Sequence, residues 1–288
     1  MENIKNDGFG SFSSFSINNF KIFKSSEIND EDIPCDHHLY MILGFPKIFI
    51  REVTENKEGL LIRVETEELI PIELTFNDGS ENYTFKKSFD NTSVEINGEH
   101  FSILDLIFEY IYSDRKSSII SEVLYIGQAQ GTDGLTNVKN RLLSHSTLQK
   151  ILSDCHDSKI NYDVRIISFS IKEDKIATTL TTEQTSKIQI EDVLVGEFFT
   201  EKSVIINIVE AGLINLLKPK YNKNFKNSSF PSRNHKSYEN YNENSNLIII
   251  DLRKLPSFIF CQLNNVKINT SEDILCCWIN ETEFVELN

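Results

Sequence analysis

Residues 121–129 read SEVLYIGQA, a short apolar run that contains Gly127 near its end. The β-branched and aromatic residues in this run predict a strand, in which alternate side chains face the same side. Tyr125 and Gly127 therefore share a face. We expect open space beside the tyrosine hydroxyl, which a backbone or a ligand can approach closely. The alternative interpretation is a core tyrosine next to a turn glycine.

A helix is predicted directly after this strand, from TNVKNRLLSH at 136–145, with Thr136 as a plausible N-cap. The next stretch, STLQKILSD, either continues this helix or begins a second one. Arg141 and His145 are four residues apart and share a helical face. A guanidinium can hold a phosphate through two parallel hydrogen bonds, and an imidazole exchanges a proton near neutral pH. The alternative interpretation is that Arg141 and His145 form a basic helix face that is exposed to solvent and has no ligand.

The clearest periodicity lies in TEKSVIINIVEAGLINLL at 200–217, where apolar residues recur at helical spacing. Thr200 can cap this helix, and Pro219 prevents its continuation. Glu210 lies on or beside the apolar face. An ionised carboxylate buried there without a partner costs several kcal/mol, so we expect a protein cation or a bound metal beside it. The alternative interpretation is that Glu210 lies at the edge of the apolar face and its carboxylate reaches water.

The flanking segments are rich in predicted strands. Short β-rich runs between 39 and 100 are separated by turn signals such as Asn97-Gly98, and FSILDLIFEYIYSD predicts a helix with Ser102 as its N-cap. NYDVRIISFSI, LIIIDL, FIFCQL and ILCCWIN predict further strands. The fold class expected is α+β, with a small, mostly antiparallel sheet flanked by helices. The expected parts are a flexible N-terminal arm at 1–30, a β-rich region at 31–100, a central domain at 101–227, a polar linker at 228–246 and a β-rich C-terminal segment at 247–288.

The composition argues for or against several classes of protein, namely membrane proteins, disulfide-rich or zinc-binding proteins, and nucleic-acid-binding proteins. No run of eighteen apolar residues exists, and the polar start has no secretory pattern, so we expect no membrane span and a cytoplasmic location. The five cysteines form no CxxC pair, which argues against a disulfide framework or a zinc knuckle. The net charge of −14 counts against nucleic-acid binding. However, Ala211–Tyr238 holds no acid and six basic residues: Lys218, Lys220, Lys223, Lys226, Arg233 and Lys236. This strip either meets a phosphate backbone or is a solvated loop.

The sequence motifs and predicted elements described above follow one another in an order that resembles the GIY-YIG nuclease superfamily. That family combines a YIG strand followed by Gln, a helix with Arg and often His one turn later, a further strand, a helix with Glu, and a proline-to-asparagine ending. The chain matches over roughly 105–224, with YIGQ at 125–128, RLLSH at 141–145, EAGLI at 210–214 and LKPKYN at 217–222.

The resemblance implies a metal-dependent endonuclease, a hydrolase that cuts phosphodiester bonds in nucleic acid, with DNA as the first candidate. Glu210 would bind a single Mg²⁺ or Mn²⁺, Arg141 would hold the scissile phosphate, and Tyr125 would orient the attacking water. His145 would assist proton transfer or contact phosphate, and Asn222 would help to fix the site. The residues expected to bind substrate are Gln128, Lys218, Lys220 and Lys223.

One part of the family pattern is missing, because no GIY string occurs and its tyrosine is a leading general-base candidate. Tyr110 and Tyr112 are the nearest upstream tyrosines but lie in a predicted helix, and Tyr40 is separated by a long insertion. The alternative function is therefore a catalytically impaired module that binds nucleic acid or a protein. An accidental match in an unrelated α+β protein is the third hypothesis. Two weaker sites, Asp36-His37-His38 and Cys155-His156, read as structural, since neighbours in sequence point to different faces.

Overall fold

The chain forms a strand-rich α+β structure with several sheets, seen in a computed structural model. Residues 11–66, 71–80, 82–114, 121–129, 137–157, 159, 161–174, 202–224, 245–255, 260–263, 266–269 and 274–278 are described. The chain divides into two compact units. Unit 1 comprises residues 1–43, 122–153 and 164–288, and unit 2 comprises residues 44–121 and 154–163. These units do not follow the expected boundaries at 30, 100 and 227, because strands distant in sequence pair with each other.

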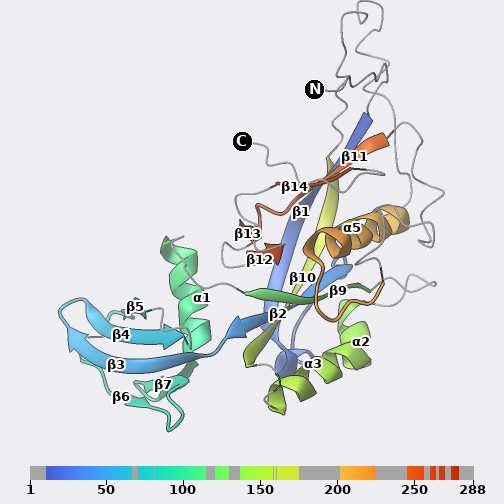
Figure 1. The fold of residues 1–288 in the computed structure, drawn as a ribbon. Helices are drawn as coiled ribbons and strands as arrows, with labels where there is room; N and C mark the ends of the chain where they lie inside the picture. The colour runs from blue at the N-terminus through green and yellow to red at the C-terminus, as the bar shows by residue number, and fades with distance from the viewer. Residues whose placement is uncertain are drawn as a thin grey trace, which may run out of the picture. The chain divides into compact units, whose positions relative to one another are not determined.

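Unit 1 is built on a six-stranded sheet with the order β14-β11-β1-β10-β2-β9 (Figure 1). β1 runs antiparallel to β10 and parallel to β11, and β11 runs antiparallel to β14. A separate hairpin pairs β12 with β13. The bounds are Ser11–Lys24 for β1, Leu39–Pro46 for β2, Glu122–Gln128 for β9, Tyr162–Asp174 for β10, Ser245–Asp251 for β11, Phe260–Leu263 for β12, Val266–Asn269 for β13 and Ile274–Trp278 for β14.

The N-terminal segment differs from the flexible arm expected at 1–30. Residues Ser11–Lys24 form β1, an inner strand of the sheet, and the 3-10 helix η1 follows at Ser25–Glu27. Phe15 and Ile17 are fully buried, so alternate residues of this Ser-rich segment do contribute to the core. The pairing of β1 with β10 shifts register between Ile17 and Phe20, and this irregularity interrupts the alternation that would have marked a strand.

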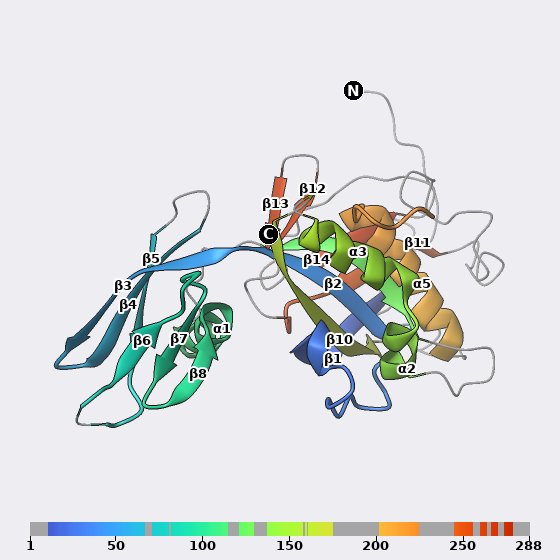
Figure 2. The same cartoon turned by 90° about the horizontal axis from the view of Figure 1, so that it is seen from below.

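Two helices of unit 1 carry predicted site residues, α2 at Val138–Leu143 with Arg141 and α5 at Lys202–Leu217 with Glu210. The helix α3 at Ser146–His156 begins directly after His145. The N-cap of α2 is Asn137, whose side chain accepts from the backbone N–H of Asn140. Thr136 and Thr200, the expected caps, lie outside the described residues. α5 ends where Lys218 adopts a positive φ of 45° and Pro219 follows. α5 contacts β9, and both Figure 1 and Figure 2 show α2 and α3 next to each other.

Unit 2 contains two three-stranded antiparallel sheets and one helix. The first sheet joins β3 (Ile48–Asn56), β4 (Gly59–Thr66) and β5 (Pro71–Phe76), and the second joins β6 (Phe85–Lys87), β7 (Ser93–Ile96) and β8 (Glu99–Ser102). The helix α1 follows at Ile103–Asp114, and the hydroxyl of Ser102 accepts from the N–H of Asp105, as an N-cap does. The β-rich region and this capped helix agree with the sequence pattern.

The C-terminal part also carries strands, β11 to β14, and the polar linker expected at 228–246 falls almost wholly on residues that are not described. Among the helices within the described ranges, none combines the length and the apolar character that crossing a membrane requires.

Candidate functional site

The YIG segment of β9 lies directly against β2. The backbone N–H of Ala129 donates to the carbonyl of His38 at 2.8 Å, and a Cβ placed on Gly127 would lie 2.6 Å from the hydroxyl of Tyr40. These two contacts pair the end of β9 with the start of β2, so the strands run in opposite directions. The space expected beside Tyr125 is therefore filled by the ring of Tyr40, which only a glycine at position 127 permits.

Three aromatic rings gather at this point. The ring centroids of Tyr125 and His145 are 4.8 Å apart, those of Tyr40 and His145 are 5.7 Å apart, and those of Tyr40 and Tyr125 are 6.2 Å apart. The rings come from β9, from the junction between α2 and α3, and from β2. Of the three upstream candidates, Tyr40 is the one that lies beside Tyr125, whereas Tyr110 and Tyr112 belong to α1 in unit 2.

The hydroxyl of Tyr40 is buried, and none of the residues that the structure describes offers it a hydrogen bond of normal geometry. Burial raises the pKa of this phenol, the nearby Tyr125 raises it further, and Arg141 opposes both effects. Burial and the Glu210 carboxylate likewise raise the pKa of Tyr125, again opposed by Arg141. Arg141 is exposed, yet it is close enough to influence both tyrosines. An orphaned buried hydroxyl is uncommon and calls for an explanation.

Glu210 on α5 is held by the amide of Gln128. The Nε2 atom of Gln128 lies 2.7 Å from Oε2 of Glu210 and 2.7 Å from Oδ1 of Asn207, to both of which it donates. Burial raises the pKa of Glu210 to about 7, while hydrogen bonding by Gln128 and the charge of Arg141 act in the opposite direction. Asn207 lies one helical turn before Glu210 and was not predicted, because an Asn at this spacing carries no signal by itself.

His145 is buried and neutral at physiological pH. Burial, and then the charge of Arg141, lower its pKa to about 4. Its Nδ1 accepts a hydrogen bond from the backbone N–H of Leu148, so the neutral ring carries its proton on Nε2. The sequence predicted that His145 assists proton transfer or contacts phosphate. Its lowered pKa leaves a neutral imidazole near pH 7, which can act as an N–H donor.

Asn222 fixes the segment after α5 to the outer edge of β9. Its side chain accepts from the N–H of Ile126 at 2.9 Å and donates to the carbonyl of the same residue at 2.8 Å. The N–H of Tyr221 also donates to the carbonyl of Leu124 at 2.9 Å. Asn222 thus holds the segment after α5 against β9, and its part in a catalytic site stays a prediction. The three lysines expected to bind substrate, Lys218, Lys220 and Lys223, are exposed.

Among the weaker candidates, His37 has a structural role, while the Nδ1 atom of His38 is buried without a hydrogen-bond partner among the described residues. Both ring nitrogens of His37 are engaged, one with the hydroxyl of Ser168 and the other with the side-chain oxygen of Asn19, each at 2.8 Å. Cys155 belongs to unit 2, and His156 is exposed. Within the part of the chain that can be described, no three His, Cys, Asp or Glu side chains gather as a metal cluster would require.

Comparison with known proteins adds no assignment: no protein-family model, no curated protein and no solved structure matches the chain.

Proposed function

We propose that unit 1 is a divergent GIY-YIG-like nuclease domain, which hydrolyses phosphodiester bonds in nucleic acid, DNA in the first instance, with a divalent cation. The observation that carries the proposal is the gathering of Tyr40, Tyr125 and His145 in ring contact, with Arg141 and Glu210 close enough to shift the pKa of the tyrosines. These residues come from segments that are far apart in sequence. Their types suit a phosphate, a cation and an attacking water.

Tyr40 takes the place of the missing GIY tyrosine in this proposal. It lies on β2, which precedes the YIG strand in the chain and pairs with it. Its buried hydroxyl makes no hydrogen bond of normal geometry with a described residue, although Arg141 and Tyr125 lie near it, so a bound water or a substrate oxygen can supply one. The divergence from the family pattern is then a change in the residues around the tyrosine, and not the loss of the tyrosine.

The donor set at Glu210 fits Mg²⁺ or Mn²⁺. Oxygens of Glu210 and Asn207 converge on one electropositive group, the Gln128 amide, which shows that the two side chains can share a positive partner. Mg²⁺ prefers oxygen ligands and retains several waters, so a single carboxylate is sufficient protein charge. The raised pKa of Glu210 means that its ionised form is costly without a cation. A bound cation would neutralise charge on the phosphate during hydrolysis.

The other side chains divide the remaining tasks. The guanidinium of Arg141 can hold two phosphate oxygens and stabilise the charge that develops on them. The hydroxyls of Tyr40 and Tyr125 can orient the attacking water. Burial raises the pKa of both phenols more than Arg141 lowers it, so they act as neutral hydrogen-bonding groups. His145 stays neutral and can donate its Nε2 proton in a hydrogen bond. Gln128 acts as a positioning residue for the carboxylate of Glu210.

The test is incubation of the purified protein with supercoiled plasmid and single-stranded DNA in the presence of Mg²⁺ or Mn²⁺. We expect cleavage that requires the metal and that falls by about 10²–10⁴-fold in Glu210→Gln, with a loss of similar order in Tyr40→Phe. Asn91→Ala, in unit 2, is a control that touches none of the site residues. The proposal is wrong if wild type and Glu210→Gln are equally inert on every substrate.

A second candidate is a catalytically impaired module that binds nucleic acid or a protein partner. The favouring observations are the Gln128 amide, which fills the point on which the two oxygens converge, and the net charge of −14. This candidate predicts salt-sensitive binding without cleavage, or no nucleic-acid binding. Glu210-dependent cutting would eliminate it.

A further inference from the structure

Two lysines lie near one aromatic ring, that of Tyr221, which follows α5. The Nζ atom of Lys150 lies 5.9 Å from the ring centroid of Tyr221, and the Nζ atom of Lys220 lies 5.8 Å from the same centroid. Lys150 comes from α3, whereas Lys220 and Tyr221 follow α5. Ammonium groups within about 6 Å of a ring are attracted to its face. The ring thus attracts two exposed cations that come from separate elements.

Tyr221, whose ring attracts both lysines, is fixed to β9 by a backbone hydrogen bond. The backbone N–H of Tyr221 donates to Leu124 of β9, and the neighbouring Asn222 makes the two hydrogen bonds to Ile126 described above. Leu124 and Ile126 flank Tyr125 in the strand, so the lysine pair is tied to the outer edge of the strand that carries the site.

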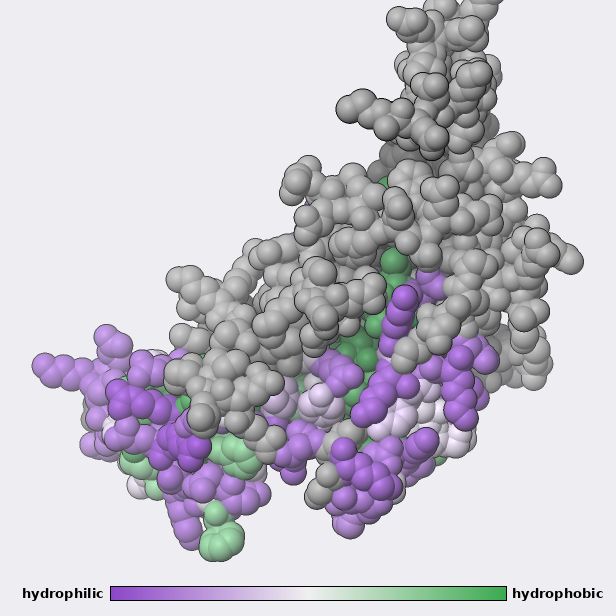
Figure 3. Space-filling view, in the orientation of Figure 1, coloured by the Kyte–Doolittle hydropathy of each residue, from purple (hydrophilic) through white to green (hydrophobic). Residues whose placement is uncertain are grey.

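The charge of the surrounding segments is opposite to that of the whole chain. Residues 137–153 and 211–224 contain no Asp or Glu, in a protein of net charge −14. They contain six cations: Lys139, Arg141, Lys150, Lys218, Lys220 and Lys223. In Figure 3 the described surface around α2 and α3 is mainly hydrophilic. Such a local concentration of cations attracts a polyanion even when the remainder of the protein repels it.

We propose that Lys150 and Lys220, held by Tyr221, form a phosphate-binding track that grips the nucleic-acid backbone on one side of the scissile phosphate. This inference rests on the proposed function for the identity of the ligand, but binding can be measured without cleavage. The two ammonium groups act as point charges for consecutive phosphates, and the track contributes affinity without sequence preference. Tyr221 acts as a positioning residue for both.

The experiment measures the dissociation constant of full-length Glu210→Gln for a fluorescent single-stranded DNA and for the matching duplex, between about 50 and 300 mM salt. We expect Lys150→Gln/Lys220→Gln in this background to bind roughly tenfold more weakly and to lower the salt slope by about 2. Tyr221→Phe keeps the ring and should bind as its parent does. Tyr221→Ala should lose part of the affinity, with a smaller change of slope.

The matched control, Lys57→Gln/Lys254→Gln, removes two exposed charges outside the track, and thermal unfolding checks that each variant is folded. The track is refuted if the Lys150/Lys220 variant and the control have the same affinity and slope, or if the parent does not bind DNA. Loss of binding in the track variant supports the track even when wild type cuts nothing, an outcome that overturns only the proposed nuclease activity. Metal-dependent cutting with unaltered binding by the track variant overturns only the track.

Discussion

At the scale of single residues, the absence of one side chain at Gly127 determines how close the two tyrosines can lie. An added Cβ would lie 2.6 Å from the Tyr40 hydroxyl and 2.7 Å from Cε1 of Tyr125. Neither ring can move freely, because Tyr40 is fully buried and both rings contact His145. The glycine is therefore required by packing and not by its backbone angles.

We predict that Gly127→Ala destabilises the protein by about 1–3 kcal/mol, the usual cost of overpacking. It should also lower metal-dependent cleavage more than its loss of stability explains, because both tyrosine hydroxyls are displaced. Chemical denaturation and cleavage rates measure the two effects. Gly79→Ala is the control, since its added Cβ meets nothing within 4 Å and only its positive φ of 84° is strained. Equal losses of cleavage in the two variants would contradict this explanation.

The raised pKa of Glu210 predicts how stability depends on pH. Its folded pKa of about 7 exceeds the value of about 4.3 in an unfolded chain, so between these values the folded protein binds more protons. The penalty for burying the carboxylate is thus absent at pH 4 and grows as the pH rises through 7. Glu210→Gln, which stays neutral, should stabilise the metal-free protein at pH 8 by on the order of 1–3 kcal/mol.

Thermal unfolding of wild type and Glu210→Gln at pH 5 and pH 8, in the presence of a chelator, tests this prediction. The difference in melting temperature should be small at the lower pH and larger at the higher pH. Added Mg²⁺ should raise the melting temperature of wild type and not that of the variant. A difference that is the same at both pH values would show that burial of the Glu210 charge is not its cause.

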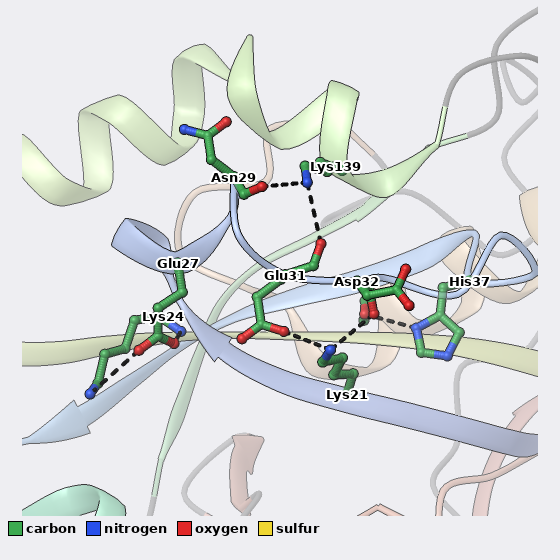
Figure 4. A network of polar contacts seen from close by, with 9 residues as sticks. Lys21, Lys24, Glu27, Asn29, Glu31, Asp32, His37 and Lys139 are labelled. Atoms are coloured by element: carbon green, nitrogen blue, oxygen red, sulfur yellow. Dashed lines mark hydrogen bonds and ion pairs between the residues drawn. The ribbon is translucent and has the colours of Figure 1, made fainter.

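At the scale of elements, one lysine ties α2 to the segment that precedes β2 (Figure 4). The Nζ atom of Lys139 donates to the backbone carbonyls of Asn29 and Glu31, in the segment between η1 and β2. Lys21 of β1 binds the same segment, through an ion pair with Glu31 and a hydrogen bond to the carbonyl of Asp32. The helix that bears Arg141 is thereby tied to the segment that leads into β2 and Tyr40.

We predict that Lys139→Met, which keeps the aliphatic stem, lowers kcat several-fold and leaves the dissociation constant for DNA nearly unchanged. The physical reason is that two hydrogen bonds to backbone carbonyls, each worth about 1 kcal/mol, no longer hold α2 in place. Hydrogen exchange of residues 25–38 should become faster. Lys254→Met is the matched control on an exposed lysine. Faster exchange without a change in kcat would make Lys139 a structural residue only.

Regular periodicity identified several elements from sequence alone, and its interruption concealed another. The helical spacing of 200–217 and the alternation of NYDVRIISFSI correspond to α5 and β10. β1 was missed because its Ser- and Asn-rich composition resembles a disordered segment and because its register shifts after Ile17. Local patterns record which residues share a face, but not which strands pair over long distances.

The same distinction applies to the site. Tyr125, Arg141 and Glu210 could be picked from their order and spacing, whereas Tyr40 could be named only as a distant option. Its place beside Gly127 depends on pairing between β2 and β9, which the local sequence does not encode. The neutral state of His145 and the bond between Gln128 and Glu210 also depend on burial and on contacts between elements. No sequence motif specifies them.

At the scale of the whole molecule, most of unit 2 is inserted between two paired strands. Tyr40 lies against Gly127, and the carbonyl of His38 accepts from the N–H of Ala129, so the start of β2 lies beside the end of β9. The chain leaves β2 and enters β9 at the same end of the pair, where a short hairpin turn could join them. Residues 44–121 therefore occupy the position of a turn in the sequence.

This topology predicts that the insertion can be removed without dismantling the site. In a variant with residues 47–120 replaced by a short turn containing Asn-Gly, we expect β2 and β9 to pair as before, because the closed loop becomes much shorter. Residues 154–163 also belong to unit 2, so apolar surface in this segment needs polar replacements, such as Tyr162→Ser. We expect Glu210-dependent cleavage to survive, with altered preference among substrates, as measured on plasmid and single-stranded DNA. A cooperatively unfolding variant that has lost all cleavage would instead show that unit 2 supplies part of the catalytic machinery.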